Sequence, residues 1–126
     1  MRKPTLKAEK AKLWKVFSEY IRRRDGGVCF TCSKKDNWKN VDAGHYHART
    51  AGLATYFLET NVHAQCTGCN RFRHGNLPAY ALALREKYGD DILEALDIER
   101  RKIKKYTIKE YQALIAEYQD KLNLIT

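Results

Sequence analysis

Near the start of the chain, apolar residues recur every three or four positions with lysines and arginines between them: Leu13, Val16, Phe17, Tyr20 and Ile21. This spacing places the apolar side chains on one face of a helix. It predicts a basic amphipathic helix over residues 5–24. Gly26 and Gly27 follow, and glycines at this position are typical of a helix end.

The last third of the chain has the same period and predicts three helices. The first covers residues 77–88, with Asn76 as a cap and Pro78 in the first turn, where proline is tolerated. The second covers residues 91–104. The third begins at Thr107.

Glu110 lies three residues after Thr107, which is the spacing of a capping box. Between the N-terminal helix and residue 77, two short stretches have strand character, at residues 40–46 and 60–66. The sequence therefore predicts an α-rich α+β fold. We expect one domain over residues 1–126, divided into the N-terminal helix (1–25), a metal-bound core (26–76) and C-terminal helices (77–126).

Composition limits the partners. The net charge is +9, and charged residues make up 31% of the 126 residues. A charge of this sign favours an acidic partner such as nucleic acid, an anionic membrane surface or an acidic protein. The chain has no run of about 18 apolar residues and no signal-peptide-like start, so we expect an intracellular protein that does not enter a membrane.

Four cysteines form two Cys-x-x-Cys pairs, Cys29/Cys32 and Cys66/Cys69. In a reducing compartment this pattern indicates a metal site rather than disulfides. Two such turns supply the four thiolates of a structural zinc site, which has no open position for chemistry. The 33 residues between the pairs are more than a simple zinc ribbon needs. The zinc is therefore expected to hold a scaffold for other residues.

Between and just after the cysteines lie "VDAGHYHAR", "NVHAQCTGCN" and "HGN". This order resembles the HNH, or ββα-metal, nuclease superfamily in its zinc-containing forms. The resemblance implies that His45 is the general base and that Asn61 braces the loop. It also implies that Asn70 binds a catalytic divalent ion.

The same blocks, together with "YALALREKYG" and "LWKVFSEYIRRRD", resemble the phage lambda NinG (Rap) recombination protein family over nearly the whole chain. Membership would imply a phage-encoded DNA endonuclease in the bacterial cytoplasm that acts on D-loops and Holliday junctions. A two-fold junction would suit a homodimer.

The sequence departs from the superfamily at Gly44, where many members carry a metal-binding side chain before the base. Asp42 and His47 are the candidates to replace it. On a regular strand, Asp42 lies on the face opposite His45, whereas His47 shares its face. A bulge at Ala43 and Gly44 would turn Asp42 inward.

These residue types suit phosphodiester hydrolysis. A neutral imidazole can take a proton from the attacking water. Mg²⁺ or Mn²⁺ neutralises charge on the phosphate oxygens and prefers oxygen ligands such as an amide or a carboxylate. The chain would thus hold two different metals, a structural Zn²⁺ and a catalytic Mg²⁺ or Mn²⁺.

Several basic residues would contact DNA backbone rather than bases. They lie around the candidate site and in a later basic run: Arg49, His63, Arg71, Arg73, His74, Arg100, Arg101, Lys102, Lys104 and Lys105. The main alternative is a zinc-ribbon nucleic-acid-binding module without catalysis, which the glycine at position 44 favours. A third interpretation is an interaction protein that uses the tyrosine-bearing C-terminal helices.

Overall fold

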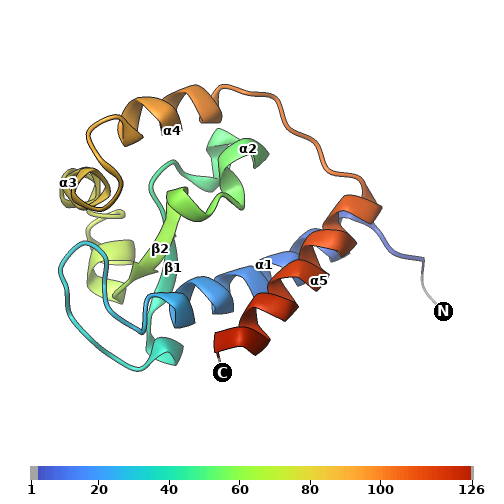
Figure 1. Ribbon diagram of the computed structural model, residues 1–126, viewed down its shortest axis with the longest axis horizontal. Coiled ribbons are helices and arrows are strands. Elements are labelled where there is room, and N and C mark those ends of the chain that lie inside the picture. Colours follow the sequence, from blue (N-terminus) through green and yellow to red (C-terminus); the bar gives the residue numbers. More distant parts are fainter. Residues whose placement is uncertain (1–2, 126) are drawn as a thin grey trace.

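The computed structural model describes residues 3–125 (Figure 1). Five α-helices surround a two-stranded sheet: α1 (Leu6–Arg24), α2 (Leu53–Tyr56), α3 (Leu77–Tyr88), α4 (Ile92–Arg100) and α5 (Ile108–Ile125), with β1 (Asp42–His45) and β2 (Val62–Gln65). Four short turns of helix complete the described part: η1 (Trp38–Asn40), η2 (Arg49–Ala51), η3 (Glu59–Asn61) and η4 (Gly68–Phe72). The predicted α-rich α+β class is confirmed.

Helix α1 has the predicted bounds and the predicted buried face. Thr5 caps it, because its Oγ1 accepts a hydrogen bond from the Ala8 N–H at 3.1 Å. Leu13, Phe17 and Ile21 are fully buried. The helix ends before Gly26 and Gly27, whose φ angles of 62° and 73° lie in the left-handed region that glycine adopts without strain.

Helix α5 lies along α1 and runs in the same direction (Figure 1). Gln112 near its start bonds Glu9, and Lys121 near its end lies over the Tyr20 ring. The capping box is confirmed, because Thr107 and Glu110 each donate a backbone N–H to the other's side chain, at 2.9 and 3.1 Å.

Strands β1 and β2 pair antiparallel without interruption, from Asp42 opposite Gln65 to His45 opposite Val62. The bulge at Ala43 and Gly44 that would turn Asp42 inward is therefore absent. Ala43 and Val62 belong to the core formed with α1 and α5. A second core covers the other side, where Tyr80 and Leu84 of α3 pack on Leu96 of α4.

Helix α3 has the predicted bounds, but the predicted capping by the Asn76 side chain and the predicted end of α4 are wrong. Asn76 is not a side-chain cap for α3: it has φ 49° and ψ 52°, and its amide donates to the Cys69 sulfur instead. Helix α4 ends at Arg100, not at residue 104, and Ile103 is 92% exposed.

The early end of α4 has a topological cause. Figure 1 shows that the segment after α4 crosses the molecule to begin α5 beside the N-terminal end of α1. Seven residues, 101–107, span about 23 Å when extended but only about 10 Å as a helix. The chain therefore has to leave the helix to reach α1. None of the helices in residues 3–125 is long and apolar enough to cross a membrane.

Candidate functional site

The four cysteines converge on one point. Their Sγ atoms all lie within 4.8 Å of one another, and those of Cys32 and Cys66 are 3.6 Å apart. Sulfur ligands about 2.3 Å from a tetrahedral zinc lie about 3.8 Å from each other, so the cluster has the size of a zinc site. Burial raises the pKa of the Cys32 thiol. Four thiolates this close together need a bound cation to balance their charge. The four sulfur ligands suit a zinc ion.

Backbone bonds fix both cysteine turns to the sheet. The Phe30 N–H, next to Cys29, donates to the Ala64 carbonyl of β2 at 2.8 Å. The second pair begins directly after β2, and its Cys66 carbonyl accepts from the Asn70 N–H at 2.9 Å. A metal held by these cysteines would therefore fix the position of Asn70 relative to β1 and β2.

A pocket of about 620 Å³ lies along the free edge of β1. Three parts of the chain line it: α1 with Trp14, Ser18 and Arg22; the β1 edge and the segments on either side of it with Lys39, Val41, Asp42, Ala43, His45, Ala48 and Arg49; and the turn after β2 with Asn70, Arg71, His74 and Gly75. His45, Asp42 and Asn70 thus border one cavity. Because β1 is an edge strand, residues from both of its faces reach this cavity.

The His45 ring is held in one orientation. Its Nε2 lies 2.9 Å from the Tyr56 carbonyl oxygen, which can only accept, so Nε2 carries the proton and Nδ1 is left as an acceptor. Trp14 stacks on the ring at 5.2 Å between centroids. Burial lowers the pKa of His45 to about 4, the bond to Tyr56 opposes this, and the charge of Arg49 adds to it.

Asn61 is fully buried and ties down the loop that follows β1. Its Oδ1 accepts from the His47 N–H at 2.9 Å, and its amide donates to the carbonyls of His47 and Thr55 at 3.1 and 3.0 Å. The loop between His47 and Thr55 carries Arg49, so Asn61 fixes the position of a cation at the pocket. This is the bracing position that the resemblance gives to Asn61.

Asp42 and Asn70 are in direct contact. The Asn70 amide donates to Asp42 Oδ2 at 3.0 Å, and Arg71 binds both oxygens of the same carboxylate at 3.0 and 3.1 Å. Gly44 makes this contact possible, because a Cβ at position 44 would collide with the Gln65 side-chain oxygen and lie 2.9 Å from Asn70 Oδ1. Gly44 is therefore required by close packing.

Hard oxygen donors surround this point. Asp42 supplies a carboxylate and Asn70 an amide oxygen with no hydrogen bond recorded within residues 3–125. Gln65 Oε1 is buried and has no partner in the same part of the chain, because the Gln65 amide nitrogen makes the bonds, to Thr31 and Gly75. An unpartnered buried oxygen beside a carboxylate suits a divalent cation such as Mg²⁺ or Mn²⁺.

His47, the other candidate ligand, does not line the pocket. Burial lowers its pKa, and the charges that act on it are Arg100 and Asp97 of α4. The prediction that it shares a face with His45 fails because β1 ends at His45 and the chain turns there. Asp42, in contact with Asn70, is the better placed of the two.

His63 is the clearest correction among the residues expected to contact DNA. Its side chain is fully buried and stacks on Phe30 at 3.9 Å between ring centroids. Its Nδ1 and Nε2 lie 3.0 and 2.8 Å from the hydroxyls of Tyr80 and Tyr88. A residue enclosed in this way cannot reach a phosphate. The Tyr80 hydroxyl also donates to the Gly44 carbonyl at 2.7 Å, so this buried set supports β1 beside the pocket.

The remaining basic candidates fall into two groups. Arg49, Arg71 and His74 line the pocket, and Arg73 is an exposed neighbour in the same turn. The run from Arg100 to Lys105 does not line it, and Figure 1 places this segment across the molecule from η4. Within the run, Arg100 and Arg101 pair with Asp97, and Lys102 pairs with Glu99.

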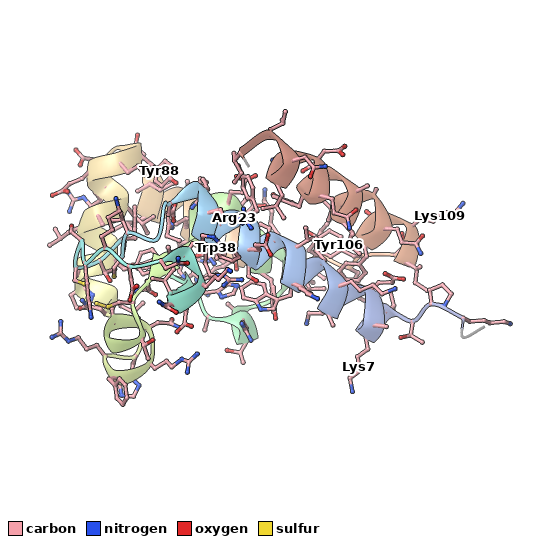
Figure 2. The ribbon with its side chains drawn as sticks, turned by 90° about the horizontal axis from the view of Figure 1, so that it is seen from below. Lys7, Arg23, Trp38, Tyr88, Tyr106 and Lys109 are labelled. Atoms are coloured by element: carbon pink, nitrogen blue, oxygen red, sulfur yellow. The ribbon has the colours of Figure 1, made fainter. Side chains whose placement is uncertain are left out.

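Sequence reasoning did not single out Trp14, Gln65 or Tyr80, and it did not place the basic residue Arg22 at the site. Trp14 carries the Arg49 guanidinium on its ring at 4.5 Å. Arg22 and Arg23 both lie over the Trp38 ring, and Figure 2 shows Arg23 beside Trp38. The one available signal was a polar face of the N-terminal helix that carries both tryptophan and arginine. The spacing of the cysteines and histidines gives no indication of it.

The family model described as Bacteriophage Lambda NinG protein matches residues 1–126. Protein ninG of Escherichia phage lambda and that of Salmonella phage P22 are each 35% identical to the chain over 104 residues, which is 82% of this chain and 50% of those proteins. Protein ninG of Escherichia phage 933W is 33% identical over 104 residues, with 82% and 51% covered. The chain therefore spans about half the length of the curated relatives it matches, and no solved structure matches it. On the full-length family match and these identities, the chain belongs to the family of the bacteriophage lambda NinG protein.

Proposed function

We propose that this chain is a metal-dependent DNA endonuclease of phage recombination, of the HNH type, that acts on branched DNA such as D-loops and Holliday junctions. The observation that carries the proposal is a neutral, oriented imidazole, His45, in the same pocket as the Asp42 and Asn70 pair. The family resemblance supplies the substrate class.

In this proposal His45 is the general base. With its Nε2 proton held by the Tyr56 carbonyl, Nδ1 accepts a proton from the water that attacks phosphorus. The low pKa of about 4 keeps the ring neutral at pH 7 but makes it a weak base. A DNA phosphate in the pocket favours the imidazolium, so substrate binding raises the pKa of His45 toward a more useful value.

The other residues bind and position the strand. Asp42 and Asn70 would hold a divalent ion, which supplies charge neutralisation at the phosphate when it is bound. Arg49, fixed on Trp14 by the loop that Asn61 braces, would bind a backbone phosphate. The four cysteines would hold Zn²⁺ and thereby fix Asn70 in place. We place the DNA on the pocket side of the molecule, over Arg49, Arg71 and Arg73.

One assay tests the catalytic assignment. Purified protein is incubated with a synthetic junction, a D-loop and linear duplex, with Mg²⁺, with Mn²⁺ or with no added ion. We expect metal-dependent nicking of the branched substrates that is lost in His45→Ala while binding remains. His47→Ala is the matched control, because that ring does not line the pocket, and it should cut as the unmodified protein does. Cleavage by His45→Ala at the unmodified rate would overturn the assignment.

A second candidate is a zinc-containing DNA-binding module without catalysis. It is favoured by Arg71, which occupies both oxygens of Asp42 and so neutralises the carboxylate that a divalent ion would need. Junction binding without nicking under every ion condition would support this candidate. An Arg71→Ala variant separates the two, since it frees Asp42 and should strengthen Mn²⁺ binding only if Asp42 is a ligand.

A further inference from the structure

Phe72 is an aromatic side chain that the fold leaves in solvent. It is 80% exposed, at the end of η4, between two exposed arginines, Arg71 and Arg73. Within residues 3–125 no ring or cation contact is recorded for it, whereas Trp14 and Trp38 are each covered by an arginine. The sequence "RFR" thus presents a free aromatic face beside the exposed Arg73, while Arg71 on its other side pairs with Asp42.

The turn that carries Phe72 is held firmly. The Arg73 N–H donates to the Gly68 carbonyl at 2.9 Å, and the Gly75 N–H lies 2.9 and 3.1 Å from the carbonyls of Cys69 and Asn70. His74 and Asn76 have φ angles of 51° and 49°, which non-glycine residues adopt only where the surroundings enforce them. These bonds hold the backbone of Phe72 on the outside of the structure, where its ring is exposed.

The position of the turn relates the ring to the pocket. Asn70, Arg71, His74 and Gly75, on both sides of Phe72 in sequence, line the pocket of His45. Phe72 does not itself line the pocket, so the nucleotide that reaches the ring would be one next to the nucleotide whose phosphate enters the pocket. Arg73 beside the ring would meet the backbone, and the ring would meet a base.

We propose that Phe72 stacks on a nucleobase that has lost a stacking neighbour, next to the phosphate in the pocket. The ligand class is DNA with an exposed base face, as found at a branch point, a gap or a strand end. Aromatic side chains bind bases in this way whatever the sequence, because every base has a π face. In continuous duplex both faces of each base are already stacked, and parting them costs free energy, so Phe72 selects branched over linear DNA. This inference rests on the proposed function and names the residue that sets its substrate preference.

The test measures binding rather than cleavage, so its failure is distinguishable from failure of the nuclease assignment. Dissociation constants are measured without added divalent ion for a junction and for linear duplex of the same length. In Phe72→Ala we expect roughly 10-fold weaker binding to the junction, the loss of one stacking contact, and no change for duplex. Phe72→Trp should retain the preference. Leu82→Ala is the matched control, because Leu82 of α3 is also an exposed apolar residue. This variant should change neither the junction affinity nor the duplex affinity.

A change in the DNA, combined with the change in the protein, gives a double-mutant cycle. An abasic site at the branch nucleotide removes the proposed partner, so it should weaken binding by the unmodified protein and have little effect on Phe72→Ala. Equal losses on junction and duplex, additive effects of the variant and the abasic site, or no effect at all would each overturn the proposal. The proposal would also be overturned if Phe72→Ala changed only the self-association of the protein, measured by sedimentation. The ring would then contact a second copy of the chain.

Discussion

The four histidines of the chain have the same side chain but different surroundings, and for His45 and His63 the surroundings lower the pKa. His45 and His63 are both held neutral by burial, which lowers their pKa values to about 4 and about 2. Of these two, only His45 borders the pocket. A low pKa therefore occurs both in His63, which has a structural role, and in His45, for which a catalytic role is proposed. The two roles are distinguished by position relative to the pocket and not by pKa.

His63 makes a prediction about stability and pH. Its folded pKa is depressed relative to about 6.5 in the unfolded chain, so between pH 6.5 and pH 2 the unfolded state binds the proton and the folded state does not. Stability therefore falls as the pH falls through this window. From pH 7 to pH 5 this one group should lower the free energy of unfolding by about 2 kcal/mol.

His63→Gln isolates that contribution, because glutamine keeps a donor and an acceptor for the two tyrosine hydroxyls but does not titrate. We expect the variant to be less stable at pH 7 yet to lose about 2 kcal/mol less between pH 7 and pH 5, measured by urea unfolding at both values. The other titrating groups, His45 included, are common to both proteins and cancel in the comparison. Parallel pH profiles for the two proteins would show that the pKa of His63 is the same in the folded and unfolded states.

At this scale the sequence identified the group formed by His45, Asn61 and Asn70, because their order relative to the cysteines is recognisable. It could not place His63. Alternation along a strand predicts one solvated face, but all four residues of β2 are buried, since cores lie on both sides of it. Which polar residue of such a strand is enclosed depends on the aromatic residues of α3, which are distant in sequence.

At the scale of elements, the two cysteine turns connect the sheet to the pocket. The turn from Cys66 to Asn76 carries Asn70, Arg71 and Phe72, yet it contributes few buried residues of its own. Its position depends on backbone bonds to the sheet and on the thiolates. A metal in the cysteine cluster would therefore be expected to order the whole proposed substrate-binding surface.

Zinc removal tests this dependence. We expect about one zinc per chain in the purified protein, retained in His45→Ala and lost in Cys66→Ser. Loss of the metal should lower the free energy of unfolding by several kcal/mol and abolish junction binding, because the turn loses its anchor. Metal content, thermal unfolding and binding are measured on the same samples. Full junction affinity in a zinc-free Cys66→Ser protein would show that the turn is held without the metal.

The elements also show where local pattern stops being informative. The first helix, both strands and the capping box at Thr107 follow from spacing and from side chains that bond within a few residues. The end of α4 does not, because residues 101–105 are compatible with a helix. It is set by the distance the chain must cover to start α5 beside α1 (Figure 1).

For the whole molecule, the question is which of its cations the proposed DNA would meet. The net charge of +9 attracts DNA from any side, but the pocket gathers Arg22 and Arg49 on one side, together with Arg71, which is paired with Asp42. The cations of the basic run after α4 lie away from this pocket, and several are neutralised by carboxylates of their own helix. We therefore expect the bound DNA to cover the pocket side and leave that run outside the contact.

The salt dependence of binding tests this arrangement. Each phosphate contact contributes about one unit to the slope of log K against log salt concentration, so Arg49→Ala and Arg73→Ala should each weaken binding and reduce the slope by about 1. Lys102→Ala removes a cation that is paired with Glu99 and does not line the pocket, and it should leave the slope unchanged. The measurement is a salt titration of junction binding for all three variants. An equal reduction in Lys102→Ala would show that the DNA also contacts the basic run after α4, because counterion release counts only the cations that the DNA contacts.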